Sequence, residues 1–428
     1  MKGPFLGELK WRGLLVESTP GIEEFLANEE VRGYIGFDPT ADSLHVGSLL
    51  QIMTLARLQR AGHTPIPVIG GGTGMVGDPS GKTAERQLQS LEQIAENAKG
   101  IRVQLERFLD FSLKGNAAIM VNNADWLRNL NYLEFLCDVG KFFSVNMMVN
   151  RDSVRRRLES QEGISYTEFS YMLLQSYDFL MLYDRHGCRL QMGGTDQWGN
   201  IVSGIDLIRR MRGVDAYGLV SPLVTMASGA KFGKTEAGTI WLDAGRTSPY
   251  KYYQFWLNTE DKDVLPYLKF FTWLGQAEIA DLERAATAKP EEREAQRVLA
   301  REVTRITHGD TAVQRAEQVS RMFFSGELAE LSAAELLDVL DDAPSTDLYF
   351  VEADRATWSK ELAELLRDCG LANSKGDGKR AIEGGGIYLS GRKISDRDYK
   401  VTLADSIEGK LFLLRKGKKQ YHVVRIIN

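Results

Sequence analysis

The amino-acid sequence predicts an α/β fold in which a parallel β-sheet domain is followed by a helical domain and a small α+β domain. Residues 32–69 read as a strand, a loop, a helix and a second strand. From Ser248 onward the apolar residues recur mainly with a helical period. Residues 387–428 alternate like short strands separated by turns. These three observations set the order of the domains along the chain.

The first pair of parallel strands is predicted at residues 32–37 and 64–69. Between them, residues 48–61 carry apolar side chains at helical spacing, and Gly62 follows as a residue that ends helices. A strand, a helix and a strand in this order form a βαβ unit, whose two strands run parallel. We therefore expect a Rossmann-like domain that binds its ligands beyond the carboxyl ends of its strands.

The remaining elements are predicted from the same patterns. The first domain is expected to add helices at 87–111 and 164–183, a strand at 117–121 and a pair of strands at 218–226. The helical domain is expected to be mainly helical at 250–257, 262–271 and 291–324, and residues 341–347 indicate a boundary. The last domain is expected to have helices at 358–369 and 378–383, a stop at glycines 384–386, and a hairpin that turns at Gly417. The predicted domains are 1–226, 248–345 and 355–428, with a mobile loop and linker at 227–247.

The composition is that of an ordinary globular chain. Of 428 residues, 43% are hydrophobic and 26% are charged, and no charge-free apolar run is long enough to span a bilayer. The N-terminal residues contain no apolar signal core. The three cysteines are far apart, which indicates reduced thiols and a cytoplasmic protein. Because no Cys and His residues cluster at metal-ligand spacing, we expect no metal site.

Charge is distributed unevenly along the chain. The net charge is −5, yet residues 355–428 contain 16 Lys and Arg against 9 Asp and Glu, a local charge of +7 that leaves −12 for the remainder. A basic domain on an acidic body indicates binding to a polyanion. A solvated basic surface explains the same charge equally well.

The glycine-rich stretch GGGTGMVGDPSGKTAER at residues 70–86 contains two phosphate-site patterns. Residues 72–77 satisfy G-x-G-x-x-G, the dinucleotide fingerprint. The following Gly-Lys-Thr resembles a P-loop, but that motif requires glycine where the chain has Val76. A dehydrogenase also needs an acidic residue at the end of a second strand, and the candidates Glu92 and Glu96 both lie in a predicted helix.

The segment GFDPTADSLHVGS at residues 36–48 leaves the first strand and enters the first helix. Asp42 or Ser43 is expected to cap that helix, so that free backbone N–H groups face an anion. His45 adds a donor in the first turn, and Gly47 leaves room for a flat base. A capped helix with an incidental histidine fits these residues equally well.

A loop after the first domain carries the sequence KFGKT at residues 231–235 among small residues. Two lysines and a hydroxyl group in a mobile loop suit a pyrophosphate whose charge grows during a reaction. Taken alone, an exposed lysine-rich turn is the simpler interpretation.

These segments together resemble a known family. The sequence HVGS at residues 45–48 is similar to the HIGH signature of class I aminoacyl-tRNA synthetases, and KFGKT is similar to their KMSKS signature. Ser48 stands where the first signature has its second histidine. The closer resemblance is to the bacterial tyrosyl-tRNA synthetases; it covers essentially the whole chain and rests on Tyr34 and on residues 37–45, 77–86, 167–171, 174–178 and 193–200.

The resemblance implies that tyrosine and ATP react to tyrosyl-adenylate and pyrophosphate, and that tyrosine then passes to the terminal adenosine of tRNA(Tyr). The catalytic residues that it implies are Thr40, His45, Lys82, Arg86, Lys231, Lys234 and Thr235. The implied tyrosine-binding residues are Tyr34 and Asp178 at the phenolic hydroxyl group, Asp78, Tyr171 and Gln175 at the α-ammonium group, and Gln197 at the carboxylate. The implied ATP-binding residues are Asp38, Gly47, Ser48, Gly194, Asp196 and Lys234.

The resemblance also implies partners. ATP is expected as a substrate with Mg²⁺ bound through its phosphates, and no membrane is expected as a partner. The family is dimeric, and the apolar residues 126–148 are the expected homodimer interface. Residues 355–428 resemble an S4-type RNA-binding domain. A second basic cluster, at Arg151, Arg155, Arg156 and Arg157, suits the acceptor stem of tRNA, although a solvated helix face fits it nearly as well.

Three alternatives remain open. A tryptophanyl-tRNA synthetase would share the fold, but the Tyr34 and Asp178 pair and the S4-like domain disfavour it. A NAD-dependent dehydrogenase would use the G-x-G-x-x-G pattern and show no dependence on ATP. A catalytically inert RNA-binding protein would keep the scaffold, and the lysines at 231 and 234 argue against it.

Overall fold

The computed structural model describes residues 5–80, 89–159, 163–227, 229, 232–235, 238–325, 330–341, 343–349, 357–417 and 420–427. The chain forms two compact units. The N-terminal unit comprises residues 1–247 and 255–307, and the C-terminal unit comprises residues 248–254 and 308–428. Each unit contains a hydrophobic core of its own.

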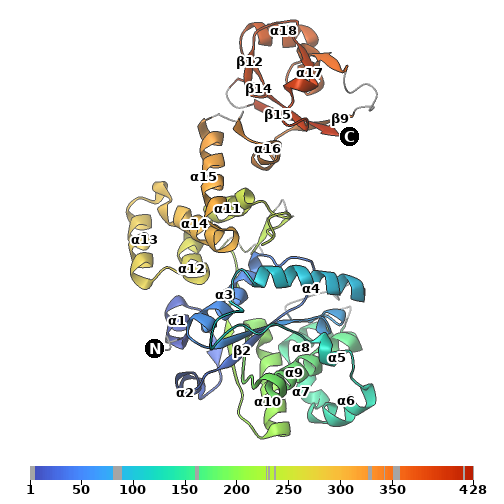
Figure 1. The fold of residues 1–428 in the computed structure, drawn as a ribbon, viewed down its shortest axis with the longest axis vertical. Coiled ribbons are helices and arrows are strands. Elements are labelled where there is room, and N and C mark those ends of the chain that lie inside the picture. The colour runs from blue at the N-terminus through green and yellow to red at the C-terminus, as the bar shows by residue number, and fades with distance from the viewer. Residues whose placement is uncertain are drawn as a thin grey trace. The chain divides into compact units, whose positions relative to one another are not determined.

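A six-stranded sheet forms the centre of the N-terminal unit (Figure 1), with the strand order β1-β6-β5-β2-β3-β4. β1 pairs antiparallel with β6, and all other neighbours in the sheet are parallel. The predicted parallel sheet is therefore confirmed. The strands are β1 (Glu17–Ser18), β2 (Arg32–Phe37), β3 (Thr64–Ile69), β4 (Val121–Asn122), β5 (Leu190–Gly194) and β6 (Tyr217–Ser221).

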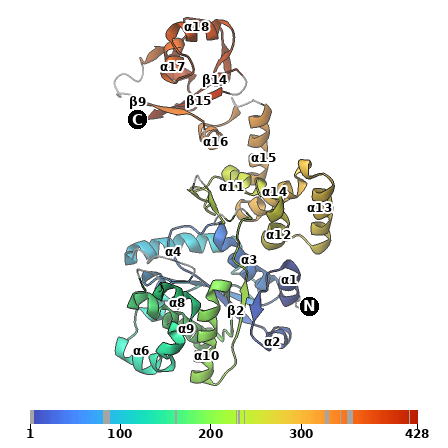
Figure 2. The same cartoon turned by 180° about the vertical axis from the view of Figure 1, so that it is seen from behind.

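Helices cover both faces of this sheet, as Figure 1 and the reverse view in Figure 2 show. On one face lie α3 (Val46–Arg60), which connects β2 to β3, and α4 (Leu91–Leu105). On the other face lie α9 (Tyr166–His186) and α10 (Trp198–Arg212). Most side chains of α3 are buried, including apolar residues on all sides of the helix, because it packs between the sheet and neighbouring helices.

The bounds of several predicted elements are corrected by the structure. Of the strand expected at 117–121, only Val121 lies in β4, and before it the Ile119 N–H donates to the Pro65 carbonyl group outside any strand. The pair of strands expected at 218–226 is the single strand β6. Of the helix expected at 87–111, residues 87 and 88 lie outside the described residues, and α4 occupies only the middle. Its start is set by Ser90, whose side chain accepts from the Gln93 N–H.

Shorter elements complete the first part of the N-terminal unit. These are α1 (Phe5–Arg12), α2 (Ile22–Asn28), the 3-10 turn η1 (Thr73–Met75), α5 (Ala124–Leu127), α6 (Tyr132–Asp138), η2 (Gly140–Phe142), α7 (Val145–Val149), α8 (Asp152–Leu158), η3 (Thr195–Gln197), β7 (Lys234–Thr235) and β8 (Gly238–Thr239). The glycine-rich residues 72–77 thus form a 3-10 turn after β3 and do not begin a helix as a dinucleotide fingerprint requires.

Helices dominate after β8, as predicted. They are α11 (Pro249–Leu257), α12 (Asp261–Phe271), α13 (Gln276–Ala288), the 3-10 turn η4 (Pro290–Glu292), α14 (Glu294–His308), α15 (Asp310–Ser325) and α16 (Ala333–Val339). The mainly helical segment expected at 291–324 is confirmed, as the two helices α14 and α15. They are separated at Gly309, which has φ +86°, a left-handed conformation that glycine adopts without strain.

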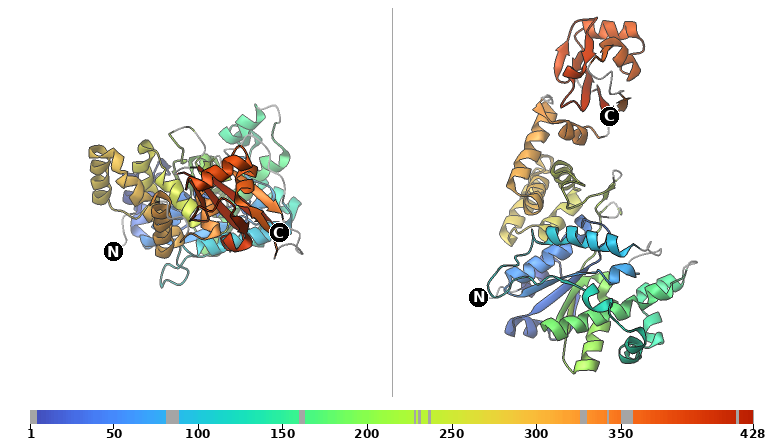
Figure 3. Two further views of the ribbon diagram at one scale, coloured as in Figure 1. Left: turned by 90° about the horizontal axis from the view of Figure 1, so that it is seen from above. Right: turned by 45° about the vertical axis from the view of Figure 1, so that its right-hand side comes forward.

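A five-stranded sheet, ordered β12-β11-β14-β15-β9, lies in the C-terminal unit. Its alternate residues face two cores. Phe412 and Leu414 pack with α17 and α18, which lie together on one face (Figure 3), whereas Leu411 and Leu413 pack with residues of α15 and α16. The elements are β9 (Ser345–Tyr349), β10 (Ser359–Glu361), α17 (Leu362–Asp368), α18 (Lys375–Glu383), β11 (Ile387–Leu389), β12 (Arg392–Ile394), β13 (Lys400–Thr402), the 3-10 turn η7 (Leu403–Asp405), β14 (Leu411–Lys416) and β15 (Gln420–Ile427).

Two features of the C-terminal unit differ from expectation. The helix predicted at 358–369 begins later, because residues 359–361 form β10 and pair with β13. Residues 345–349, which overlap the expected boundary at 341–347, form β9 and pair in parallel with β15 at the edge of the sheet. The hairpin with its turn at Gly417 is confirmed, and Gly417 has φ +66°. Among the described residues, no helix combines the length and the apolar character needed to cross a membrane.

Candidate active site

A cavity of about 380 Å³ lies at the carboxyl ends of the parallel strands in the N-terminal unit. It runs from Tyr34 and Asp178 at one end to the start of α3 at the other. The structure brings most of the predicted site residues together as its lining: Tyr34, Asp38, Thr40, His45, Gly47, Ser48, Asp78, Tyr171, Gln175, Asp178, Gly194, Asp196 and Gln197.

Asp178 on α9 is the buried acid of this cavity. Its Oδ2 accepts a hydrogen bond from Asn123 Nδ2 at 2.8 Å, and its Oδ1 accepts one from Trp126 Nε1 at 2.7 Å. Burial raises the pKa of Asp178 to about 7, because desolvation of the carboxylate outweighs these two hydrogen bonds. The carboxyl group is thus held in place with both oxygen atoms turned to N–H donors, and it changes its charge near neutral pH.

Tyr34 on β2 lies beside this acid. Its side chain is buried, its ring packs against Phe179 with centroids 5.2 Å apart, and its hydroxyl oxygen has no hydrogen-bond partner among the described residues. Burial, reinforced by Asp178, raises the pKa of Tyr34 well above its ordinary value, so the hydroxyl stays protonated. A buried hydroxyl without a partner costs free energy until a ligand supplies one.

A polar chain links this end of the cavity to the loop after β2. Asn123 Nδ2 also donates to Thr73 Oγ1 at 2.9 Å, and Thr73 Oγ1 donates to Asp38 Oδ1 at 3.1 Å. Asn123 Oδ1 accepts from the Gly72 N–H at 2.7 Å, which fixes the glycine-rich turn against β4. The turn therefore supports the wall of the cavity through side-chain hydrogen bonds.

Amide groups surround a second carboxylate near the middle of the cavity. Gln197 Nε2 donates to Asp78 Oδ2 at 2.7 Å, and the Ser80 N–H donates to Asp78 Oδ1 at 2.9 Å. Gln197 Oε1 in turn accepts from Gln175 Nε2 and from Asn200 Nδ2, each at 3.2 Å. This network presents one negative charge and several amide dipoles, which suits a ligand that carries both an ammonium and a carboxylate group.

At the other end of the cavity, α3 begins at His45. The structure corrects the predicted cap: neither Asp42 nor Ser43 caps the helix, and His45 Nδ1 instead accepts from the Gly47 N–H at 3.0 Å. Ser43 Oγ donates to the Leu44 carbonyl group. A Cβ atom at Gly47 would lie 2.6 Å from the His45 ring, so a larger residue there would displace the ring.

Gly194 and Asp196 follow β5 on the same side of the cavity. A Cβ atom at Gly194 would lie 2.6 Å from Asp196 Oδ1 and 3.0 Å from Leu223, so the chain passes close to its neighbours here. Burial, together with the nearby charge of Asp78, raises the pKa of Asp196. The carboxylate of Asp196 is held next to open space in the cavity.

Five predicted catalytic side chains are not described. Lys82, Arg86 and Lys231 lie outside the described residues. Lys234 and Thr235 are described as backbone in β7, which pairs with β8. Among the described residues, no group of three or more Asp, Glu, His and Cys side chains is placed to hold a metal ion.

Comparison with known proteins assigns the chain to a family. Residues 26–325 match the family of class I tRNA synthetases (W and Y), and residues 335–424 match the SYY-like C-terminal domain of tyrosine–tRNA ligase. The chain is 55% identical, over 99% of both sequences, to a tyrosine–tRNA ligase of Roseiflexus castenholzii. It is 49% identical to that of Bacillus caldotenax, over 98% of this chain and 99% of the other. The chain belongs to the tyrosine–tRNA ligases.

Solved structures agree with this family. A C-terminally truncated mitochondrial tyrosyl-tRNA synthetase of Aspergillus nidulans has a TM-score of 0.67 and 29% identity, covering 75% of this chain and 94% of the other. A tryptophanyl-tRNA synthetase of Encephalitozoon cuniculi has a TM-score of 0.51 and 12% identity, covering 73% and 87%. The second likeness shows a shared fold alone. The identification excludes the dehydrogenase interpretation of the glycine-rich stretch.

Sequence reasoning missed several residues of this ligase that build the cavity wall. Asn123 and Thr73 are fully buried and join Asp178 to Asp38. The position of Asn123 directly after β4 could have indicated it, because polar residues at the carboxyl ends of parallel strands lie at the ligand side of a sheet. Trp126 begins the stretch expected to contain the dimer interface; its side chain is 5% exposed and its Nε1 donates to Asp178.

The basic cluster on α8 also differs from its prediction. Arg157 is buried and forms an ion pair with the equally buried Glu168, with 2.8 Å between Nη2 and Oε2. Arg151 is partly buried and donates to Ser203 Oγ at 3.1 Å. Arg155 and Arg156 are exposed, so two of the four arginines of the predicted basic cluster lie on the surface.

Proposed function

We propose that the cavity activates L-tyrosine with ATP to form tyrosyl-adenylate and pyrophosphate, and that the protein then transfers tyrosine to the 3′ terminal adenosine of tRNA(Tyr). The observation that carries this proposal is the pair formed by the buried, partnerless hydroxyl of Tyr34 and the fixed carboxyl group of Asp178. A phenolic hydroxyl group placed between them donates to Asp178 and accepts from Tyr34. Phenylalanine would leave the Tyr34 hydroxyl without a partner and give Asp178 no further donor, and tryptophan offers no hydroxyl group at this point.

The amide network around Asp78 then binds the other end of tyrosine. The α-ammonium group lies between Asp78, Gln175 and the hydroxyl of Tyr171, and Gln197 faces the carboxylate. These groups hold the carboxylate in line with the α-phosphorus of ATP. A carboxylate oxygen forms a bond to this phosphorus as the bond from the phosphorus to the departing pyrophosphate breaks. Because the substrate carboxylate is itself the nucleophile, the protein needs no general base, and positioning carries most of the catalysis.

The start of α3 and the segments beside it bind the nucleotide. Gly47 and Gly194 leave space for the adenosine, with Asp38, Ser48 and Asp196 around it. Thr40 and His45 face the γ-phosphate side, and the charge that develops on the pyrophosphate is stabilised by cations. The side chains proposed for that role are Lys82, Arg86, Lys231, Lys234 and Thr235. Mg²⁺ arrives on the phosphates of ATP.

The second half-reaction needs tRNA, and the basic C-terminal residues 355–428 are proposed to bind it as an S4-like domain. Arg155 and Arg156 are proposed for the acceptor stem. We also propose a cytoplasmic homodimer, with the exposed side chains of Tyr132, Leu133 and Val145 in its interface. The hydroxyl groups of Tyr132 and Tyr166 lie 3.0 Å apart on this surface, which joins α6 to α9.

The test is the rate of tyrosyl-adenylate formation in the variant Asp178→Ala. Removing the carboxyl group leaves the N–H groups of Asn123 and Trp126 and the substrate hydroxyl unpaired, a loss of about 3 kcal/mol, or on the order of 100-fold in kcat/KM for tyrosine. If Asp178→Ala activates tyrosine as fast as the wild type, the proposal that this cavity binds the phenolic hydroxyl of tyrosine is wrong.

A further inference from the structure

The chain segment that carries KFGKT is fixed to the start of α3 by backbone hydrogen bonds. The Ile240 N–H donates to the Gly233 carbonyl group at 3.0 Å, and the Val46 N–H donates to the Ile240 carbonyl group at 3.0 Å. Gly233 has φ +75°, and a Cβ atom there would lie 2.5 Å from Val46 Cγ2. The described part of this segment therefore lies directly against the first residue of the helix that lines the cavity.

One face of α12 holds the same segment from the other side. Asp263, Tyr267 and Phe271 are four residues apart and project from one face of the helix. Asp263 Oδ2 accepts from the Ala227 N–H at 2.9 Å, and Tyr267 Oη donates to the Thr225 carbonyl group at 2.9 Å. Both bonds hold the backbone between β6 and the KFGKT segment, and neither serves the cavity itself.

Phe232, the second residue of KFGKT, supplies the third contact with α12. It is buried and stacks on Phe271 with an interplanar angle of 5° and centroids 5.6 Å apart. It also meets the ring of Tyr267 edge-on at 5.2 Å and lies 5.9 Å from the ring of Trp256. The three contacts thus spread along one face of α12, from Asp263 in its first turn to Phe271 at its end.

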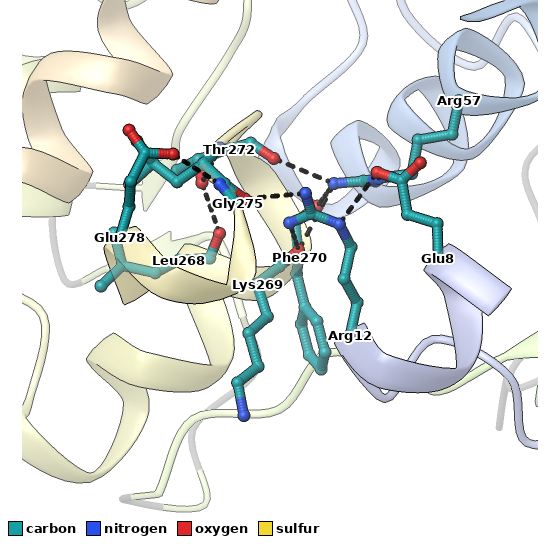
Figure 4. A network of polar contacts seen from close by, with 10 residues as sticks. Glu8, Arg12, Arg57, Leu268, Lys269, Phe270, Thr272, Gly275 and Glu278 are labelled. Atoms are coloured by element: carbon teal, nitrogen blue, oxygen red, sulfur yellow. Dashed lines mark hydrogen bonds and ion pairs between the residues drawn. The ribbon is translucent and has the colours of Figure 1, made fainter. Parts of the chain in front are cut away.

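The far end of α12 is tied to α3 and α1 by two buried arginine side chains (Figure 4). Arg57 Nη2 on α3 donates to the carbonyl groups of Phe270 at 2.8 Å and Thr272 at 3.2 Å. Arg12 Nη1 on α1 donates to the Lys269 carbonyl group at 2.8 Å. These carbonyl groups belong to the last turn of α12 and to its C-cap residue Thr272, where the carbonyl groups lack helical N–H partners and a cation is favoured.

The charge of Arg57 is retained in this buried place. Desolvation lowers the pKa of Arg57 to about 9, which leaves the guanidinium group protonated at neutral pH. Its Nε lies 3.7 Å from Glu8 Oε1, and its guanidinium group lies 5.3 Å from the ring centre of Trp273. Arg57 lies on α3, and His45 caps the same helix. The end of α12 is therefore attached to the helix that lines the cavity.

We propose that α12 sets the position of the KFGKT segment relative to the start of α3, with Asp263 and Tyr267 as positioning residues for adenylate formation. The proposal rests on the proposed function, in which Lys234 and its neighbours stabilise the departing pyrophosphate. Neither Asp263 nor Tyr267 lines the cavity, so both act through the backbone that they hold. A shift of that backbone changes the rate of the chemical step and leaves tyrosine binding as it is.

The experiment measures the rate constant of tyrosyl-adenylate formation by stopped-flow fluorescence, together with the Kd of tyrosine, in the full-length protein. Tyr267→Phe removes one hydroxyl and keeps the ring against Phe232. Asp263→Ala removes the acceptor for the Ala227 N–H, and Asp263→Asn keeps an acceptor oxygen. The matched control is Tyr250→Phe, which removes the hydroxyl of a partly buried tyrosine that packs in the C-terminal unit.

We expect Tyr267→Phe and Asp263→Ala each to lower the rate constant about tenfold and the double variant about 100-fold, since a displacement of about 1 Å costs that much. The Kd of tyrosine is expected to stay within about twofold in every variant, and Asp263→Asn is expected to restore most of the rate, whereas Tyr250→Phe changes neither quantity.

Two results overturn the inference. Rate constants near the wild-type value in Tyr267→Phe and Asp263→Ala show that α12 does not position the segment. Equal losses in rate and in tyrosine affinity show a general structural defect. A wild-type protein that forms no adenylate contradicts the proposed function itself, and the inference with it, so the wild-type rate separates that failure from the other two.

Discussion

The pKa of Asp178 gives the affinity for tyrosine a dependence on pH near neutrality. Both carboxylate oxygens already accept N–H bonds, from Asn123 and Trp126, and the proposed phenolic hydroxyl of the substrate donates a further one. A proton on the carboxyl group competes with these donors for the same lone pairs. We therefore expect tyrosine to bind the ionised form, and acidification to weaken binding.

The magnitude follows from the pKa of about 7 for Asp178. The apparent Kd of tyrosine equals the Kd of the fully ionised protein divided by the ionised fraction of Asp178. Relative to its value at high pH, the apparent Kd is therefore about twofold higher at pH 7, about tenfold higher at pH 6 and about 30-fold higher at pH 5.5. The stability of the free protein depends on pH in the opposite direction: it falls as the pH rises, whereas tyrosine binding becomes tighter. A carboxyl group with a raised pKa contributes stability that is complete below its ordinary pKa of 3.8 and is lost as the pH rises through about 7.

Isothermal titration of tyrosine without ATP, between pH 5.5 and 8, measures this dependence. The control is Asp178→Asn, in which binding is weaker and flat with pH, because the titrating group is gone. Asp38 and Asp196 remain in that variant, so any dependence that they cause persists there. A wild-type Kd that is constant within twofold over this range, or a dependence that survives in Asp178→Asn, refutes the reasoning.

Further predictions concern the loop, the core and the interface. Gly233→Ala is expected to slow adenylate formation about tenfold in stopped-flow experiments, because the new Cβ atom would clash with Val46 of α3. The control is Gly229→Ala, since Gly229 also has a positive φ, +79°, but has open space around its Cβ position. Equal effects of the two substitutions would contradict the clash. Glu168→Ala is expected to cost about 3 kcal/mol, seen as a lower Tm by calorimetry, because it leaves the charge of Arg157 buried; an unchanged Tm would count against the pair. Leu133→Asp is expected to shift the proposed homodimer toward monomer in sedimentation, and a dimer that the substitution leaves unchanged would place the interface elsewhere.

The sequence predicted local features well, because they depend on neighbours along the chain. The βαβ unit from β2 to β3 follows from the spacing of apolar residues, and the turn at Gly417 follows from a residue that tolerates positive φ. The lining of the cavity came from the resemblance to a family, with each residue at its matching position. The break at Gly309 was missed because a lone glycine is tolerated inside helices.

Contacts between distant residues could not be predicted in this way. Asn123 and Trp126 meet Asp178 across more than fifty positions of sequence, and nothing in the local pattern of either residue indicates the acid. Arg157 shares its helix with exposed arginines, and its burial depends on a carboxylate from α9. The cap of α3 was assigned to the residue types that usually form caps, whereas the histidine two positions before Gly47 takes that place.

The central claim is that this cavity activates tyrosine, and ATP–pyrophosphate exchange tests it most directly. The purified protein is supplied with each of the twenty amino acids in turn, without tRNA. The account predicts exchange with tyrosine alone, because only a phenolic hydroxyl pairs with both Tyr34 and Asp178. Exchange with tryptophan instead would keep the fold and contradict the pocket, and exchange with no amino acid would contradict the activity.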